Sequence, residues 1–308
     1  MSAAAPALNA APSASTSSTV PGGARMAMLL APALLVVVVF FVTPFAILLA
    51  FSLGAKTSAQ WTPTLAQFLR LFGDPLYQRI ILTTIGIALQ VTVLTLVVGY
   101  AMALALVRSR SLHRRFLLNL VVLPLMLSGV IRTFGWIVLL AQNGAVNSVL
   151  GQLGAIDAPV KFLGTNLGVV VGLTHILLPF MVLAIHSNLS YIPASLADAA
   201  GGLGATPLRS FLRVTLPLSL PGIASGTLLV FIMSMGAFIT PAMLGYGRVR
   251  VLPILVFEQT TTNVNWNFAS AAAVTLLLIT MTFLLIHRRV LRPRRDWRGK
   301  GAARGLFR

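Results

Sequence analysis

The stretch YIPASLADAAGGLGATPLRSFLRVTLPLSLP, residues 191–221, is a polar interruption between two apolar segments that are each long enough to cross a bilayer. Both of its ends are therefore held at the same face of the membrane. We expect a loop of about thirty residues on one side of the bilayer, between the fourth and fifth spans of the chain.

The composition of this loop predicts two short helices joined by a glycine turn. Pro193 suits the first turn of a helix, where a missing backbone donor costs nothing, and residues 195–200 are compatible with its continuation. Glycine enters positive-φ conformations without a steric penalty, so the glycines that follow are expected to end that helix. These are Gly201, Gly202 and Gly204. Thr206 followed by Pro207 is typical of the N-cap and first residue of a second helix.

The second helix is predicted to be amphipathic. Leu208, Phe211 and Leu212 share one face, and Arg209 and Arg213 share another at i,i+4 spacing. A membrane protein that holds such a helix pair off its surface presents it to a partner. In the alternative interpretation the pair is a connector whose apolar face lies on its own bundle or in the lipid headgroups.

The spacing within the loop resembles the EAA loop of ABC importer permeases, whose pattern is E-A-A-x3-G-x9-I-x-L-P. Asp replaces the Glu and Val replaces the Ile, and the spacing is kept residue for residue. The matching positions are Asp198, Ala199, Ala200, Gly204, Val214, Leu216 and Pro217. In that family the loop forms a coupling helix that docks into a groove on a cytoplasmic ATPase subunit. The resemblance therefore implies that these residues form an ATPase-coupling loop.

The resemblance extends over roughly residues 123–267 to permeases of the spermidine/putrescine class, through VLPLMLSGVIRTFGWIVLL, GLTHILLPFMVLAIHSNLSYIP and FIMSMGAFITPAMLGYGRV. It implies an all-α integral membrane protein with the six-helix bundle of a type I ABC importer permease, which works by alternating access. The partners it implies are two cytoplasmic ATP-binding subunits, a second homologous permease in a heterodimer, and a periplasmic substrate-binding protein. ATP hydrolysis then belongs to a separate subunit, and this chain is not an enzyme.

The substrate implied by the resemblance is a polyamine or a related small solute. Polyamine-type loops usually carry an acidic residue where this chain has Gly202. Similar permeases serve phosphonates, opines or iron, and selectivity resides mainly in the binding protein.

Composition independently predicts an integral membrane protein. Apolar residues make up 57% of the 308 residues and charged residues 9%, and the mean hydropathy is +0.92. The formal net charge of +18 does not indicate nucleic-acid binding, because the basic residues fall in loops and at the C-terminus without interleaved aromatics. Contact of these basic residues with membrane lipid explains the charge better. The absence of cysteine excludes disulfides and thiolate metal sites.

Six apolar runs are each long enough to span a bilayer, and the first is longer than the core of a cleavable signal peptide. They cover residues 26–53, 80–107, 116–141, 167–189, 222–244 and 268–287. Residues 1–24 are predicted to be a disordered tail, residues 25–290 the six-span domain, and residues 291–308 a basic cytoplasmic tail.

The basic residues predict the orientation of these spans. With the N-terminus inside, sixteen Lys and Arg fall in cytoplasmic segments and six in external ones. The positive-inside rule therefore predicts a multi-pass protein of the bacterial inner membrane with both termini and the loop at 191–221 in the cytoplasm.

No arrangement of residues suited to catalysis, metal binding or a cofactor is found. The five acidic residues all lie outside the predicted spans, and neither an HExxH nor a Walker A sequence occurs. His175 and His186 lie eleven residues apart in the fourth span and share a face, where packing histidines are commoner than proton or metal sites.

The candidate translocation pathway is predicted from polar and small residues within the spans. Arg132 is the one clear intramembrane charge, and it is expected to face the bundle interior or snorkel outward. The fifth span begins with the small-xxx-small pair Gly222 and Gly226, which allows close helix packing. Its outer part contributes the remaining candidates, Ser234, Met235, Phe238 and Thr240, just before an expected break at Pro241. Simple bundle packing is the alternative for each of them.

A second function class remains open. A gradient-driven secondary transporter or channel would use the loop at 191–221 merely as a connector. Such proteins often carry intramembrane carboxylates or repeated halves, and the sequence shows neither.

Overall fold

A computed structural model describes residues 23–54, 63–109 and 111–290 of the chain. Most of the predicted N-terminal tail and the whole of the predicted basic tail lie outside these residues. The described secondary structure is entirely helical. The chain divides into two units, Met1–Leu48 and Leu49–Arg308.

The first unit contains the predicted first span. Helix α1 (Gly23–Val37) continues through a π-helical turn, η1 (Val38–Val42), into α2 (Thr43–Ser52), whose last residues belong to the second unit. The π turn directly precedes Pro44, which has no backbone N–H to donate, and the Thr43 hydroxyl donates to the Val38 carbonyl at 3.0 Å. The helix is thus locally adjusted beside Pro44, whereas Pro32 lies inside the regular helix α1. The candidate span, Leu30–Ser52, has a mean hydropathy of 3.0.

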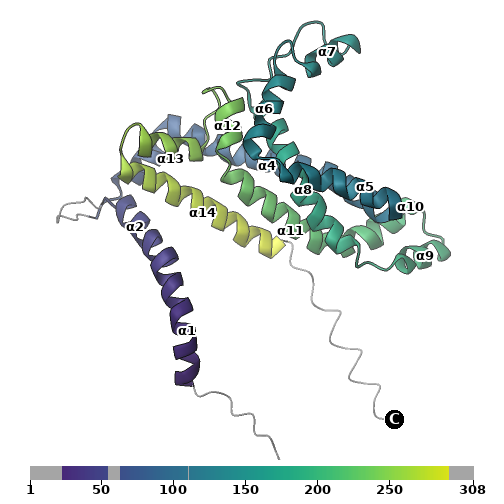
Figure 1. Ribbon diagram of the computed structural model, residues 1–308, viewed down its shortest axis with the longest axis horizontal. Helices are drawn as coiled ribbons and strands as arrows, with labels where there is room; N and C mark the ends of the chain where they lie inside the picture. Colours follow the sequence, from purple (N-terminus) through teal and green to yellow (C-terminus); the bar gives the residue numbers. More distant parts are fainter. Residues whose placement is uncertain (1–22, 55–62, 110, 291–308) are drawn as a thin grey trace, which may run out of the picture. The chain divides into compact units, whose positions relative to one another are not determined.

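The second unit is built on three long helices, α4 (Pro75–Arg108), α8 (Asn166–Leu189) and α11 (Leu216–Met235), which pack on one another (Figure 1). Their shared core includes fully buried aliphatic side chains from each helix, among them Val91, Met181 and Val230. Helix α14 (Trp266–Val290) packs on α11, where the rings of Phe231 and Phe283 stack at 3.5 Å. The predicted second, fourth and sixth spans are confirmed by α4, α8 and α14.

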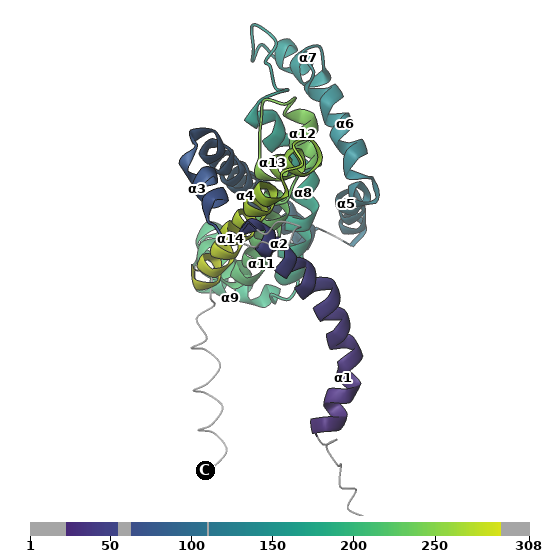
Figure 2. The ribbon, with the colours of Figure 1, turned by 90° about the vertical axis from the view of Figure 1, so that its left-hand side faces the viewer.

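Short helices lie at the two ends of this bundle. Figures 1 and 2 show α12 (Ile239–Leu244) and α13 (Leu252–Thr261) at one end and α9 (Ala194–Gly202) at the other. Helix α10 (Pro207–Ser210) lies at the same end as α9 (Figure 1). Helix α3 (Ala66–Gly73) packs with α4 and α14 around a second core that contains Leu71 and Phe268.

The predicted third span, residues 116–141, is not one straight helix. The chain forms α5 (Ser111–Val122), a 3₁₀ turn η2 (Leu123–Met126), α6 (Gly129–Leu140) and α7 (Ala145–Gln152), with a bend of 101° between the two halves. Pro124 lies in the 3₁₀ turn, and the Ser128 hydroxyl starts a new helix by accepting from Val130 N at 3.3 Å. The described residues thus contain five straight candidate spans, or six if the bent pair is one span.

The fifth predicted span, residues 222–244, also has different bounds. Its helix begins at Pro207, runs through α10 and a π-helical turn η3 (Phe211–Thr215) into α11, and ends at Met235. The break falls at Gly236, the C-cap of α11, and Pro241 lies inside the separate helix α12. The expected break at Pro241 is therefore wrong, because α12 begins only two residues earlier, so Pro241 lies in its first turn, where a missing donor is harmless.

Candidate functional site

The loop between α8 and α11 folds as a helix, a tight glycine turn and a second helix. Helix α9 ends with two hydrogen bonds, from Gly204 N to Gly201 O at 2.9 Å and from Ala205 N to Ala200 O at 3.0 Å. Together with φ +81° at Gly204, these bonds form a Schellman C-cap. The turn predicted at the glycines is confirmed, although only Gly204 takes the left-handed conformation.

The second helix starts as its sequence predicts. The Thr206 hydroxyl accepts from Arg209 N at 3.4 Å, and Pro207 occupies the first turn. This helix does not stop within the loop, because it continues through η3 into α11. The loop and the membrane-embedded helix α11 are therefore one continuous helical segment.

The outer surface of the loop combines apolar and basic groups. Leu203 is 89% exposed, and Leu208 and Leu212 are also largely exposed. Two adjoining hollows, of about 270 and 330 Å³, are both lined by Arg209 and Arg213. This surface suits a partner that supplies apolar side chains together with carboxylates or carbonyl groups.

Phe211 does not share that surface, contrary to the predicted apolar face. Its ring packs edge-on against Tyr100 of α4 at 5.8 Å, and the Tyr100 hydroxyl hydrogen-bonds with Ser219 at 3.0 Å. Ser210, beside Phe211, is also buried. The second helix thus turns one side to its own bundle and keeps the other side free.

The residues that match the EAA pattern divide between these two sides. Asp198, Ala199 and Gly204 are exposed in α9 and its turn, and Pro217 is exposed near the start of α11. Ala200, Val214 and Leu216 are half-buried. The exposed members are available to a partner.

The candidate pathway residues lie around the break between α11 and α12. Thr240 exchanges a hydrogen bond with Thr133 of α6 at 3.2 Å, and the neighbouring Arg132 donates from Nη1 to the Ile176 carbonyl of α8 at 3.3 Å. The structure thus brings Arg132 and Thr240 to one junction, where α6 is attached to both α12 and α8. This arrangement is consistent with Arg132 serving an interhelical hydrogen bond.

The other three pathway candidates do not join that junction. Met235 is buried in a cluster with Ala88 and Phe231, and Phe238 packs against Phe257 of α13 at 4.9 Å between ring centroids. Ser234 is buried at the end of α11. The five candidates therefore do not form a single surface within this chain.

Several buried polar atoms have no hydrogen-bond partner among the described residues. They are Arg132 Nε, Thr174 Oγ1, His175 Nδ1, His186 Nδ1, Asn188 Oδ1 and Ser234 Oγ. Most of them lie on α8, and buried polar groups without partners mark places where water or a ligand is accommodated. Sequence reasoning did not assign Thr133 or Thr174 to a site, because partners such as Thr133 and Thr240 lie 107 positions apart in sequence.

Comparison with known proteins identifies the family. Residues 95–296 match the model of the binding-protein-dependent transport system inner membrane component. The chain belongs to this family. The match covers the loop at 191–221, all of α8 and α11, the last part of α4 and both sides of the α11–α12 break. This permease therefore carries every candidate site within its family domain.

Curated relatives cover most of the permease. It is 34% identical over 229 residues to the spermidine/putrescine transport system permease protein of Escherichia coli, covering 74% of this chain and 83% of that protein. The Haemophilus influenzae protein of the same description is 33% identical over 73% of this chain and 79% of its own length. The molybdenum transport system permease protein of Mycobacterium bovis is 34% identical, over 71% of this chain and 81% of that protein.

Solved structures share the fold. A bacterial ABC transporter involved in the import of alginate has a chain that aligns with a TM-score of 0.70 and 22% identity, covering 89% of this permease and 96% of that chain. A chain of a methionine ABC transporter aligns with a TM-score of 0.55 and 19% identity, covering 70% of this permease and 95% of that chain. The permease therefore has the helical fold of ABC importer permeases.

Proposed function

We propose that this permease is the transmembrane subunit of an ATP-driven importer, and that it carries a polyamine or a related small solute from a periplasmic binding protein to the cytoplasm by alternating access. In this proposal two cytoplasmic ATP-binding subunits dock on the loop at 191–221. A second, homologous permease completes the pathway, and both termini of the chain are cytoplasmic.

One observation carries the coupling part of the proposal: the loop and α11 are a single helical segment from Pro207 to Met235. A partner that moves α10 is expected to move α11 as well, because helical backbone connects them without a break. Helix α11 in turn packs on α4, α8 and α14, so its displacement rearranges the bundle. Docking at an exposed loop is thereby connected to the membrane interior.

The charged residues of the spans support a heterodimer of two different permeases if the substrate is a polyamine. Among the described residues the carboxylates Asp74, Asp157, Asp198 and Glu258 all lie outside the long spanning stretches, and Arg132 is the charge at the α6–α8 junction. A polycation in a low-dielectric pathway needs carboxylate partners, which the other permease then has to supply. Two of the relatives named above are described as transport permeases for spermidine and putrescine and for molybdenum, at the same identity of 34%. In this proposal the binding protein therefore decides between substrates.

The coupling proposal is tested by two glycine substitutions in the same loop. Gly204→Val forces a β-branched residue into φ +81°, although no neighbouring atom obstructs the new side chain, so the change acts on the backbone alone. Gly202→Val adds the same side chain to open space at the end of α9 and is the matched control. We expect Gly204→Val to lower ATP-driven uptake at least about tenfold and to weaken co-purification of the ATPase subunit, at a strain cost of about 1–3 kcal/mol.

Uptake is measured in proteoliposomes that contain ATP, this permease and the ATPase, second permease and binding protein of the proposed importer. We expect Gly202→Val to transport at near wild-type rates. Uptake that continues without ATP and collapses with a proton uncoupler would instead identify a gradient-driven transporter. Near wild-type transport by Gly204→Val, at normal membrane levels, would refute the coupling role.

A further inference from the structure

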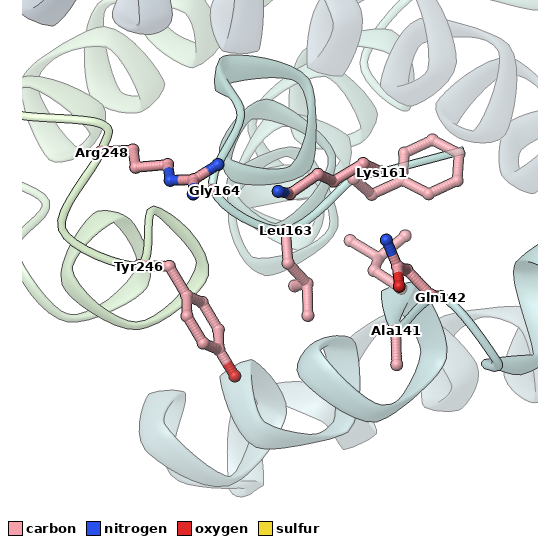
Figure 3. Close-up of a pocket in the computed structure, with 9 residues that line it drawn as sticks. Ala141, Gln142, Lys161, Leu163, Gly164, Tyr246 and Arg248 are labelled. Carbon is pink, nitrogen blue, oxygen red and sulfur yellow. The ribbon is translucent and has the colours of Figure 1, made fainter. Parts of the chain in front are cut away.

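A pocket of about 440 Å³ opens at the end of the bundle opposite to the loop at 191–221. Three segments form its walls, residues 140–142 at the end of α6, residues 161–164 before α8, and Tyr246 with Arg248 after α12 (Figure 3). None of these residues takes part in the coupling loop or the α6–α8 junction. The function proposed above does not use this pocket.

Two of the walls are joined by one buried amide. Asn147, which is 5% exposed, donates from Nδ2 to Ala141 O at 3.1 Å and to Val160 O at 3.0 Å, and its Oδ1 accepts from Val160 N at 2.9 Å. These three hydrogen bonds hold the segment before Lys161 against the end of α6. The relative position of the two walls is therefore fixed.

The third wall is joined to the second through backbone contacts. Gly164 N donates to Leu244 O at 2.8 Å, and Gly164 has φ +76°. A Cβ at Gly164 would lie 3.3 Å from Cδ of Arg248, so the glycine lets this arginine lie close across the loop. Tyr246, which is not a glycine, is held at φ +46° beside it, a conformation that costs energy and is retained mostly at functional sites.

The mouth of this rigid pocket carries two positive charges. Figure 3 shows the Lys161 amine and the Arg248 guanidinium directed toward each other above Leu163. Neither side chain has a hydrogen bond or an ion pair within the part of the chain that the structure describes, and no carboxylate lines the pocket. Nearby Arg250 is different, because it pairs with Glu258 at 4.0 Å.

We propose that this pocket receives an acidic side chain of the substrate-loaded periplasmic binding protein, with the carboxylate held between Lys161 and Arg248. An amine and a guanidinium that converge without a counter-ion are complementary to a carboxylate. The apolar lining from Leu140 and Leu163 accommodates the stem of a Glu or Asp and its neighbours. This inference rests on the proposed function, because it requires that end of the bundle to face the periplasm.

A zero-length cross-link tests the contact directly. A carbodiimide condenses a carboxylate with an amine, with net loss of water, only when the two groups touch. The chain has three lysines, Lys56, Lys161 and Lys300, so few products can form. In the complete transporter in lipid nanodiscs with its substrate-loaded binding protein, we expect mass spectrometry to find an amide between Lys161 and an Asp or Glu of the binding protein. Lys161→Arg keeps the charge but should remove this product.

Affinity provides the second measurement, with a matched control two residues away. We expect the double variant Lys161→Gln/Arg248→Gln to bind the substrate-loaded binding protein about tenfold more weakly at low salt, and to lose part of the salt dependence of binding. Arg250→Gln removes an arginine from the same loop outside the pocket and should change the affinity less than about twofold. Co-purification of the ATPase subunit should be unchanged in all of these variants.

The outcomes separate the two proposals. Wild-type binding that the double variant retains, or cross-links that never include Lys161, would overturn the pocket assignment and leave the importer function standing. A wild-type chain that binds no binding protein and no ATPase subunit would overturn the proposed function, and this inference with it.

Discussion

At the scale of single residues, Gly222 lets α11 lie close to Asn188 of α8. A Cβ placed on Gly222 would lie 2.6 Å from the Cβ of Asn188 and 3.3 Å from the Ala184 carbonyl. A Cβ atom cannot move without its backbone, so the two helices can relieve this clash only by separating. At Gly226 the nearest atom is instead the sulfur of Met181, at 2.7 Å, which is flexible and can rotate away.

We therefore expect Gly222→Ala to destabilise the permease by about 1–3 kcal/mol, even though alanine favours helices. Asn188→Gly removes the opposing Cβ and loses no hydrogen bond of its amide oxygen, which has no partner among the described residues. The double variant should recover part of the loss. Thermal unfolding midpoints in detergent measure this, and Gly86→Ala, where nothing lies within 4 Å, is the control. Additive losses in the double variant would show that the clash is not between these two residues.

The residues that sequence could predict are those whose role is set by near neighbours. Thr206 and Gly204 are examples, because a helix cap depends on hydrogen bonds within a few positions. The small-xxx-small pair was predicted to allow close packing, and the structure supplies its partners, Asn188 and Met181. The pocket at Lys161 and Arg248 could not be predicted, because its walls come from segments that only the tertiary fold brings together.

At the scale of elements, the least expected feature is the continuity of α10, η3 and α11. The sequence predicted a second helix within the loop and a fifth span that begins only at residue 222. Two prolines in the continuous helix are tolerated, because Pro217 lies near the π turn and Pro221 lies where the helix is partly exposed. The bend between α5 and α6 was not predicted, because the apolar pattern gives no sign of it. The apolar run continues from the second half of α5 through η2 into α6, and hydropathy does not report the direction of a helix.

A less stable helix at the start of α11 should uncouple the loop at 191–221 from the α11–α12 break. Leu218 and Leu220 are 44% and 38% exposed, so replacing them removes few internal contacts. Leu218→Gly/Leu220→Gly weakens the helix by about 1 kcal/mol per residue relative to the matched Leu218→Ala/Leu220→Ala pair. We expect the glycine pair to retain ATPase binding and ATP hydrolysis but to lose most uptake. Equal uptake by the glycine and alanine pairs would mean that the continuous helix is not the coupling element.

At the scale of the whole molecule, the fold class was predictable because bilayer thickness sets the length that a span needs and hydropathy locates the apolar runs that reach it. Orientation rests on a different property, the excess of basic residues in one set of loops. The family match and the curated relatives agree with a multi-pass inner-membrane permease. The side on which each loop lies remains a prediction from charge.

The absence of cysteine allows orientation to be measured without background. Leu203, in the loop at 191–221, and Leu153, in the segment after α7, are 89% and 75% exposed. We expect a membrane-impermeant maleimide to label Leu153→Cys in intact spheroplasts, and to label Leu203→Cys only after the membrane is opened. Labelling of Leu203→Cys in sealed spheroplasts would reverse the orientation, and the loop could then not meet a cytoplasmic ATPase.

The continuous helix from Pro207 to Met235 also has a mechanical consequence. Its 29 residues span about 44 Å at a rise of 1.5 Å per residue, so a rotation of about 10° at one end displaces the other by about 7 to 8 Å. A small tilt of α10, imposed by a docked partner, would therefore be amplified along the helix. The resulting displacement at the α11–α12 break would be as large as the width of a small solute.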